Sequence, residues 1–243
     1  MRLTCAELGG NEEHVYPAAI ALEMIHTYSL IHDDLPAMDD DSYRRGKLTN
    51  HKKFGEATAI LAGDGLLTNS FHAISTSPLY SAEEKVHIIS KLTTASGLEG
   101  MVAGQLLDME AEKKSISILE LEHIHHLKTG GRLISFAVEI GGYIAGLPSN
   151  KLQTLKSLGE YLGIIFQIQD DILDVEGDEE VIGKKVGSDS ENDKSTYPSI
   201  LGLEGAKIYK EKYLEEAMKC IEIVGLKNTV LADITRYLSE RNQ

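Results

Sequence analysis

The sequence predicts an all-α protein, and two observations support this fold class. Apolar residues recur with the period of a helix through most of the 243 residues. No stretch alternates apolar and polar residues in a way that favours a strand, and there is no low-complexity tract or clear linker. The hydrophobic fraction of 42% is enough for a sizeable core. We therefore expect one helical domain that spans residues 1–243.

Breaks in the periodicity set the limits of the expected helices. Gly9 and Gly10 end an opening helix, Pro78 separates two longer ones, and Pro148 begins a further break. Residues 177–198 are charged and contain glycine without an apolar period, so we expect a mobile loop there. The expected helices cover residues 1–8, 16–34, 56–74, 82–108, 118–140, 143–147, 152–175, 203–224 and 226–238.

The composition argues against several classes of protein. A formal net charge of −14 is wrong for non-specific nucleic-acid binding, which needs a basic surface. Cys5 and Cys220 form neither a disulfide framework nor a metal-ligand spacing, which favours a reducing compartment. Glu23 and His26 interrupt the longest N-terminal apolar run, so no membrane span is predicted, and the first residues lack the apolar core of a signal peptide. We expect a cytoplasmic protein.

Two aspartate clusters follow directly on apolar helical segments. The first is DDLPAMDDD (residues 33–41) and the second is DDILD (residues 170–174). Carboxylates in these places are costly, because a helix C-terminus repels anions and apolar surroundings disfavour charge. Mg²⁺ takes carboxylate oxygens as ligands and completes its shell with water and phosphate. Two facing clusters would therefore hold several metal ions and, through them, a diphosphate.

The two clusters differ in geometry. Asp170 and Asp174 lie four apart and share one helix face, with Asp171 beside them. In the first cluster Pro36 disfavours a helix, so we expect the helix to end there and Asp39 to swing back toward Asp33. An isolated acidic run is usually a solvated turn, and that alternative stays open for residues 33–41.

Basic residues accompany both clusters, as an anionic ligand would require. Two arginines begin a polar loop after the first cluster, one lysine precedes a pair of glycines within a helical segment, and three lysines lie on the expected mobile loop. Each alone is more often a solvated surface charge, and only their repeated pairing with aspartates favours a site. These residues are Arg44, Arg45, Lys128, Lys184, Lys185 and Lys194.

Several motifs resemble those of bacterial farnesyl diphosphate synthases. HTYSLIHDDLPAMD (residues 26–39) with RRG (44–46) resembles the first aspartate-rich motif of that family, and FQIQDDILD (166–174) resembles the second. The resemblance runs from about residue 3 to the end of the chain, and it implies an isoprenoid synthase-type helical bundle around a central pocket. Matching in the same order are GQLLD (104–108), KTG (128–130), GK (183–184) and DKSTYP (193–198).

The resemblance implies a prenyltransferase that condenses isopentenyl diphosphate with an allylic diphosphate (dimethylallyl or geranyl) to make farnesyl diphosphate. About three Mg²⁺ ions, with Mn²⁺ as an alternative, would be held by both clusters. The implied metal ligands are Asp33, Asp34, Asp39, Asp170, Asp171 and Asp174. The allylic diphosphate would contact Arg44, Lys128, Thr129, Gln167, Lys184 and Lys194, and three of these, Lys128, Thr129 and Gln167, would act at the reacting carbon.

Three further roles come from the same resemblance. His26 and Arg45 would hold isopentenyl diphosphate, although a lone histidine here is by default a core residue. Tyr28, the fifth residue before Asp33, would stop chain growth at fifteen carbons, where the default role is again a core aromatic. The released diphosphate would remove the proton, so no protein base is expected. A homodimer is the expected assembly.

The start of the chain departs from the family's pattern. Family members carry further N-terminal helices with a Gly-Lys-Arg-x-Arg-Pro motif that holds isopentenyl diphosphate, whereas this chain starts just past it and Arg2 does not replace it. We therefore expect an N-terminally incomplete domain with impaired activity. Two alternatives stay open: a synthase of geranylgeranyl or longer prenyl diphosphates, and a non-catalytic partner subunit that binds prenyl diphosphates. A terpene cyclase is disfavoured because no Asn/Ser/Glu-type second metal motif is found.

Overall fold

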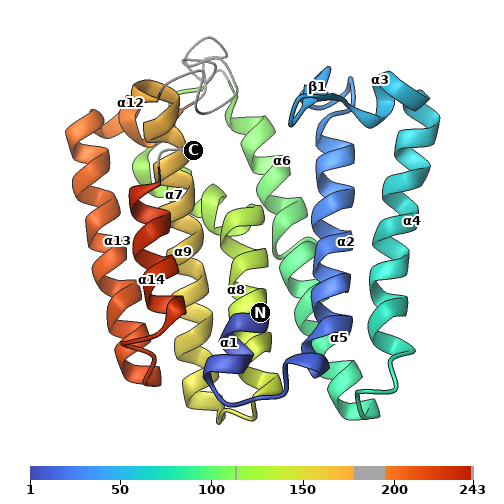
Figure 1. The fold of residues 1–243 in the computed structure, drawn as a ribbon. Coiled ribbons are helices and arrows are strands. Elements are labelled where there is room, and N and C mark those ends of the chain that lie inside the picture. The colour runs from blue at the N-terminus through green and yellow to red at the C-terminus, as the bar shows by residue number, and fades with distance from the viewer. Residues whose placement is uncertain (113, 178–194, 242–243) are drawn as a thin grey trace. The chain divides into compact units, whose positions relative to one another are not determined.

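The computed structural model describes residues 1–112, 114–177 and 195–241, so most of the predicted loop 177–198 lies outside the described residues. The described part is helical apart from one short two-stranded hairpin, which confirms the predicted all-α class (Figure 1). The chain forms two compact units, Glu13–Leu92 and the combination of Met1–Glu12 with Thr93–Gln243. The positions of these units relative to one another are not determined, so a single domain over residues 1–243 stays a prediction.

The unit Glu13–Leu92 is built on two long helices that lie side by side, α2 (Tyr16–Asp33) and α4 (Glu56–Ser75) (Figure 1). A side chain at Gly63 of α4 would collide with the His32 ring of α2, so glycine permits this close approach. The shorter elements of the unit are a 3-10 turn (Glu12–Val15), β1 (Tyr43–Arg44), β2 (Lys47–Leu48), α3 (Asn50–Phe54) and the first part of α5 (Ala82–Ser96).

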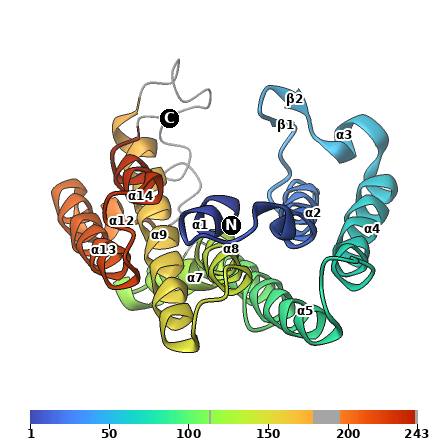
Figure 2. The same ribbon diagram turned by 60° about the horizontal axis from the view of Figure 1, so that its bottom comes forward.

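The other unit packs its helices around α9 (Ser149–Glu176), a helix of 28 residues. Figure 2 shows α13 and α14 beside α9, and α8 also packs against it. The remaining elements are α1 (Arg2–Glu7), α6 (Met101–Ala111), α7 (Ile118–Leu127), α8 (Thr129–Ile144), α12 (Tyr197–Leu201), α13 (Leu203–Val224) and α14 (Val230–Glu240).

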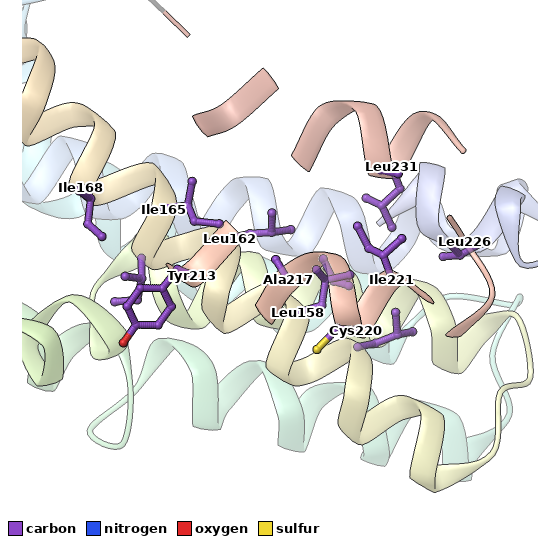
Figure 3. Close-up of a cluster of buried hydrophobic side chains, with 14 of the residues drawn as sticks. Leu158, Leu162, Ile165, Ile168, Tyr213, Ala217, Cys220, Ile221, Leu226 and Leu231 are labelled. Atoms are coloured by element: carbon purple, nitrogen blue, oxygen red, sulfur yellow. The ribbon is translucent and has the colours of Figure 1, made fainter. Parts of the chain in front are cut away.

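An apolar stripe at helical spacing makes α9 the centre of this core. Leu158, Leu162 and Ile165 are buried on α9 and belong to the same cluster as Ile221 of α13 and Leu231 of α14 (Figure 3). Full burial of each such side chain contributes about 1.5–3 kcal/mol. The stripe fixes the rotation of α9 about its axis, and with it the direction of the aspartates near its C-terminal end.

Two of the predicted helices are each two helices in the structure. The segment 82–108 divides into α5 and α6, because Gly97 and Gly100 close a tight turn in which the Gly100 amide donates to the Gly97 carbonyl at 3.0 Å. The segment 118–140 divides into α7 and α8 at Lys128, whose extended backbone (ψ 174°) cannot belong to a helix. Apolar periodicity continued through both breaks and therefore concealed them.

Smaller differences occur at other boundaries. The separate helix predicted for 143–147 does not form, since α8 runs to Ile144 and Gly146, two residues later, has a φ of +80° that does not continue a helix. The last helix begins at Val230 rather than at residue 226. The polar segment 44–50, predicted as a loop, holds a hairpin of two-residue strands. None of the described helices is long and apolar enough to cross a membrane.

Candidate functional site

The first aspartate cluster forms a closed turn at the C-terminal end of α2. The helix ends at Asp33, and the Asp39 amide donates a hydrogen bond of 2.9 Å to the Asp33 carbonyl. Inside this loop the Met38 amide donates to the Leu35 carbonyl at 2.9 Å, one residue before Pro36. The prediction that the proline interrupts the helix and returns Asp39 to Asp33 is confirmed. The two aspartates therefore sit at the ends of one loop.

Asp34 has a structural partner within the same unit. Its buried carboxylate accepts from the Arg44 guanidinium on β1, with 2.9 Å from Nε and 2.7 Å from Nη2. This hydrogen bond raises the pKa of Arg44. The β1–β2 hairpin turns at Arg45 and Gly46, both with positive φ (52° and 73°), and this turn leaves the Arg45 side chain exposed. The pairing fixes the hairpin to the end of α2.

His26 lies on α2 about two turns before the cluster and is half-buried. Burial lowers its pKa, and Arg45 and Arg44 lower it further against the opposing effect of Glu23. Nδ1 of His26 is buried and has no hydrogen-bond partner among the described residues. The electrostatic effect of both arginines on His26 indicates that these three predicted residues lie in one neighbourhood of the unit.

Tyr28 is buried on α2, as its default role as a core aromatic predicts. Its ring meets the His32 ring edge to face, with centroids 5.7 Å apart. Burial raises the pKa of the Tyr28 hydroxyl, and the charge of Asp33 raises it further. The Tyr28 ring is therefore buried on α2, a little over one turn before the acidic turn begins at Asp33.

The second cluster lies at the C-terminal end of α9, and its three carboxylates have different surroundings. The Asp171 carboxylate is buried and accepts a hydrogen bond of 2.9 Å from the Tyr197 amide, at the start of α12. Asp170 is partly exposed and pairs with the Arg241 guanidinium. Asp174, one turn after Asp170, is buried. The sequence placed Asp170 and Asp174 on one face but could not distinguish these environments.

A small cavity of 80 Å³ gathers two of the predicted substrate residues in this unit. Lys128 and Gln167 line it together with Asp171 of the second cluster. Lys128 precedes α8 at the break after α7, and its Nζ pairs with the Asp108 carboxylate of α6. A Cβ at Gly104 would lie 2.6 Å from the Lys128 amide nitrogen, so only glycine lets α6 pass this close.

His125 also lines this cavity and was not singled out from the sequence. Its side chain is buried beside Lys128, and its ring lies 5.4 Å from that of Tyr197. Burial lowers the pKa of His125 to about 3, with a further contribution from the Lys128 charge.

Sequence reasoning also missed Arg241, whose contact with Asp170 spans 71 positions and leaves no local signal. Asp108, in contrast, was part of a recognised motif.

Some predicted residues cannot be placed. Lys184 and Lys194 lie outside the described residues, and so does the side chain of Thr129, although Thr129 is the first residue of α8. The first cluster belongs to one unit and the second to the other, so their separation is not determined.

The donor atoms of both clusters suit a hard divalent cation. Within the described ranges, no three metal-binding side chains group closely enough to hold an ion by protein ligands alone. Mg²⁺ does not need such a cage, since one or two carboxylates suffice when water and phosphate oxygens complete the shell. The closed loop from Asp33 to Asp39 and the partly exposed Asp170 offer that kind of partial coordination.

Comparison with known proteins identifies the family. Residues 1–231 match the polyprenyl synthetase family. The farnesyl diphosphate synthase of Bacillus subtilis is 51% identical over 236 residues, which cover 96% of this chain and 79% of that protein. The enzyme of the same name from Micrococcus luteus is 53% identical over 240 residues, covering 99% of this chain and 82% of that protein.

Solved structures agree with this family. A farnesyl/geranylfarnesyl diphosphate synthase from Zymomonas mobilis has a TM-score of 0.84 and 33% identity, covering 97% of this chain and 80% of that one. A geranyltransferase from Helicobacter pylori, complexed with magnesium and isoprenyl diphosphate, has a TM-score of 0.80 and 34% identity, covering 94% of this chain and 75% of that one. The chain belongs to the polyprenyl synthetase family. The relatives that share about half of its sequence are bacterial farnesyl diphosphate synthases.

Proposed function

We propose that the protein condenses isopentenyl diphosphate with geranyl or dimethylallyl diphosphate to form farnesyl diphosphate. The observation that carries this proposal is the pair of acidic helix ends, each paired with an arginine, in a chain of the polyprenyl synthetase family. The family gives the reaction class, and identity near 50% to farnesyl diphosphate synthases favours the fifteen-carbon product.

Asp33, Asp39 and Asp170 are the proposed metal ligands whose surroundings best fit that role. Asp33 and Asp39 close one loop, and Asp170 is partly exposed at the end of α9. Asp34 and Asp171 shape the two clusters through Arg44 and the Tyr197 amide. Asp174, on the face of Asp170, remains a candidate ligand. Bound Mg²⁺, about three ions in the proposal, would neutralise the diphosphate and stabilise the charge that develops as it leaves.

Cationic and polar side chains would hold the two substrates. Lys128 and Gln167, which share a cavity, are proposed to contact the allylic diphosphate, together with Arg44, Thr129, Lys184 and Lys194. His26 and Arg45 are proposed to bind isopentenyl diphosphate. The charge of Arg45 lowers the pKa of His26, and this effect supports a common binding role. Lys128 presents a localised charge held by Asp108, which keeps the ammonium in place before substrate arrives.

The proposed reaction needs no protein side chain to remove a proton. The allylic carbon–oxygen bond breaks and the diphosphate leaves with the electron pair. The isopentenyl double bond attacks the resulting allylic cation and forms the new carbon–carbon bond. The diphosphate oxygen then takes the proton lost by the condensed product. The chain's residues position two anions and exclude water, which is catalysis by orientation and charge stabilisation.

Incubation with Mg²⁺, geranyl diphosphate and labelled isopentenyl diphosphate tests the proposal. We expect labelled farnesyl diphosphate, none with EDTA, and a fall of at least about a hundredfold in rate for Asp170→Asn. Metal-dependent binding of an unreactive geranyl thiolodiphosphate should be lost in the same variant. A folded wild-type chain that neither binds this analogue with Mg²⁺ nor forms product would contradict the proposal. Light scattering of the same sample checks the proposed homodimer.

Tyr28 is the proposed limit on product length. Because its buried ring lies on α2 before the acidic turn, removal of the ring should open space along that helix. We expect Tyr28→Ala to release products longer than fifteen carbons, and Tyr28→Phe to leave the length unchanged. An unchanged product from a folded, active Tyr28→Ala variant would favour another determinant of length.

A further inference from the structure

Arg241, the residue that follows α14, is held against α9 beside the second aspartate cluster. Its guanidinium pairs with the Asp170 carboxylate, lies 4.1 Å from the centre of the Phe166 ring and donates to the Phe166 carbonyl at 3.3 Å. All these groups belong to one compact unit. The contact is therefore part of the core architecture of that unit and does not depend on the other.

The backbone around Arg241 is fixed as firmly as its side chain. The Gln169 amide group donates to the Arg241 carbonyl at 2.7 Å. Lys210 of α13 donates to both the Gln169 side chain at 2.7 Å and the Ser239 carbonyl at 2.6 Å. This chain of hydrogen bonds joins α9, α13 and the end of α14, and it aims the guanidinium at Asp170.

We propose that Arg241 is the resident cation of Asp170 in the metal-free protein, and that a divalent metal must compete with it for that carboxylate. The proposal rests on the metal-binding role given to Asp170 in the proposed function. The side chain of Arg241 is only 11% exposed and that of Asp170 38%, so solvent screens their attraction less than it would on an open surface. A metal at Asp170 meets a carboxylate whose charge is already partly neutralised and a second cation close by.

The competition predicts that Arg241 lowers the affinity of the second cluster for metal. With Arg241 present, the second cluster keeps a compensated charge without metal, and metal affinity is lower than the carboxylates alone would give. With the guanidinium removed, Asp170 loses its counter-ion and a divalent cation should bind more tightly. A merely structural role for Arg241 predicts the opposite or no change, because disorder of Asp170 would weaken the metal site.

Mn²⁺ titration of the full chain, followed by the electron paramagnetic resonance signal of free Mn²⁺, tests the proposal. Arg241→Gln should lower the Mn²⁺ dissociation constant by at least about threefold. Arg236→Gln is the matched control, because it removes one positive charge from α14 itself, where Arg236 pairs with Asp233 of the same helix at 3.1 Å. Arg236→Gln should leave the Mn²⁺ dissociation constant unchanged. In an Asp170→Asn background, Arg241→Gln should have no effect.

The outcomes separate the two proposals. Tighter binding in Arg241→Gln but not in Arg236→Gln supports the competition. Equal or weaker binding in Arg241→Gln, while the wild type binds Mn²⁺, overturns it and leaves the proposed function intact. No Mn²⁺ binding by the folded wild type also overturns the competition, because no metal then contends with Arg241 for Asp170, while the proposed function is decided by the product assay. If Arg241→Gln does not fold, as judged by circular dichroism, Arg241→Met replaces it, because it removes the charge and keeps an apolar stem beside Phe166. Unchanged affinity in that variant overturns the competition.

Discussion

Adjacent carboxylates in this protein have different partners, and the difference separates structure from chemistry. Asp171 is buried and accepts the Tyr197 amide, whereas its neighbour Asp170 is partly exposed and faces a guanidinium. Asp34 likewise pairs with Arg44, while Asp33 and Asp39 close the loop beside it. An aspartate-rich motif therefore contains residues that shape the site as well as residues proposed to bind the metal.

Removal of the Asp171 carboxylate should cost stability. Asp171→Ala leaves the Tyr197 amide without its acceptor, and an unpaired buried group costs about 1–3 kcal/mol. Urea unfolding should show this loss. Asp171→Asn keeps one acceptor oxygen and should lose less, while retaining most Mn²⁺ binding. A stable Asp171→Asn variant that binds no metal would instead make Asp171 a ligand.

His125 should make stability depend on pH. Its folded pKa of about 3 lies below the ordinary value of 6.5, so on acidification the unfolded chain takes up a proton that the folded chain refuses. This part of the stability is complete above pH 6.5, and it is lost by about 1.4 kcal/mol per pH unit as the pH falls toward 3.

Urea unfolding of the wild type and of His125→Gln between pH 7.5 and 5 measures that contribution. Between pH 6.5 and 5 the wild type should lose about 2 kcal/mol more than the variant. Other histidines with lowered pKa values, such as His26 and His126, affect both proteins equally and cancel in the difference. Parallel pH profiles for the two proteins would show that His125 is protonated in the folded state.

At the scale of elements, α14 is held at both ends by other parts of its unit. At its start, the Glu7 carboxylate of α1 accepts from the Val230 amide at 2.7 Å and from the Leu231 amide at 3.3 Å. At its end, Arg241 contacts α9. A carboxylate at a helix N-terminus satisfies unpaired amides and suits the helix dipole. The first residues of the chain thus stabilise the helix that leads to Arg241, the partner of Asp170.

Glu7→Ala should therefore lower the free energy of unfolding by about 0.5–2 kcal/mol. The nearby Glu12→Ala variant is the control, since Glu12 pairs with Arg2 on the exposed surface and such pairs are worth about 0–1 kcal/mol. Denaturant titrations of the two variants provide the comparison. Equal losses would mean that Glu7 contributes no more than a surface charge.

Features that depend on neighbouring residues could be predicted from the sequence, whereas features that depend on tertiary contacts could not. The loop from Asp33 to Asp39 was predictable because Pro36 acts on its own neighbours. The break at Lys128 was not, because the apolar pattern ran through it and the close crossing at Gly104 is a tertiary feature. The contacts of Asp170 and Asp171 with Arg241 and Tyr197 join distant residues, so no local pattern could have assigned them.

At the scale of the whole molecule, the proposed reaction requires the two units to act together. One unit carries the first aspartate cluster with Arg44 and Arg45, and the other carries the second cluster with Lys128 and Gln167. Residues 1–231, which match the polyprenyl synthetase family, include both aspartate clusters. We propose that both clusters hold the same metal–diphosphate assembly.

Calorimetric titration of geranyl thiolodiphosphate in the presence of Mg²⁺ tests this claim most directly, with wild type, Asp39→Asn, Asp170→Asn and the double variant. One shared assembly predicts that each single change weakens binding by at least about tenfold and that the double change is far from additive, with a coupling energy above about 0.5 kcal/mol. Additive losses, or a loss in only one of the single variants, would contradict a site built from both clusters.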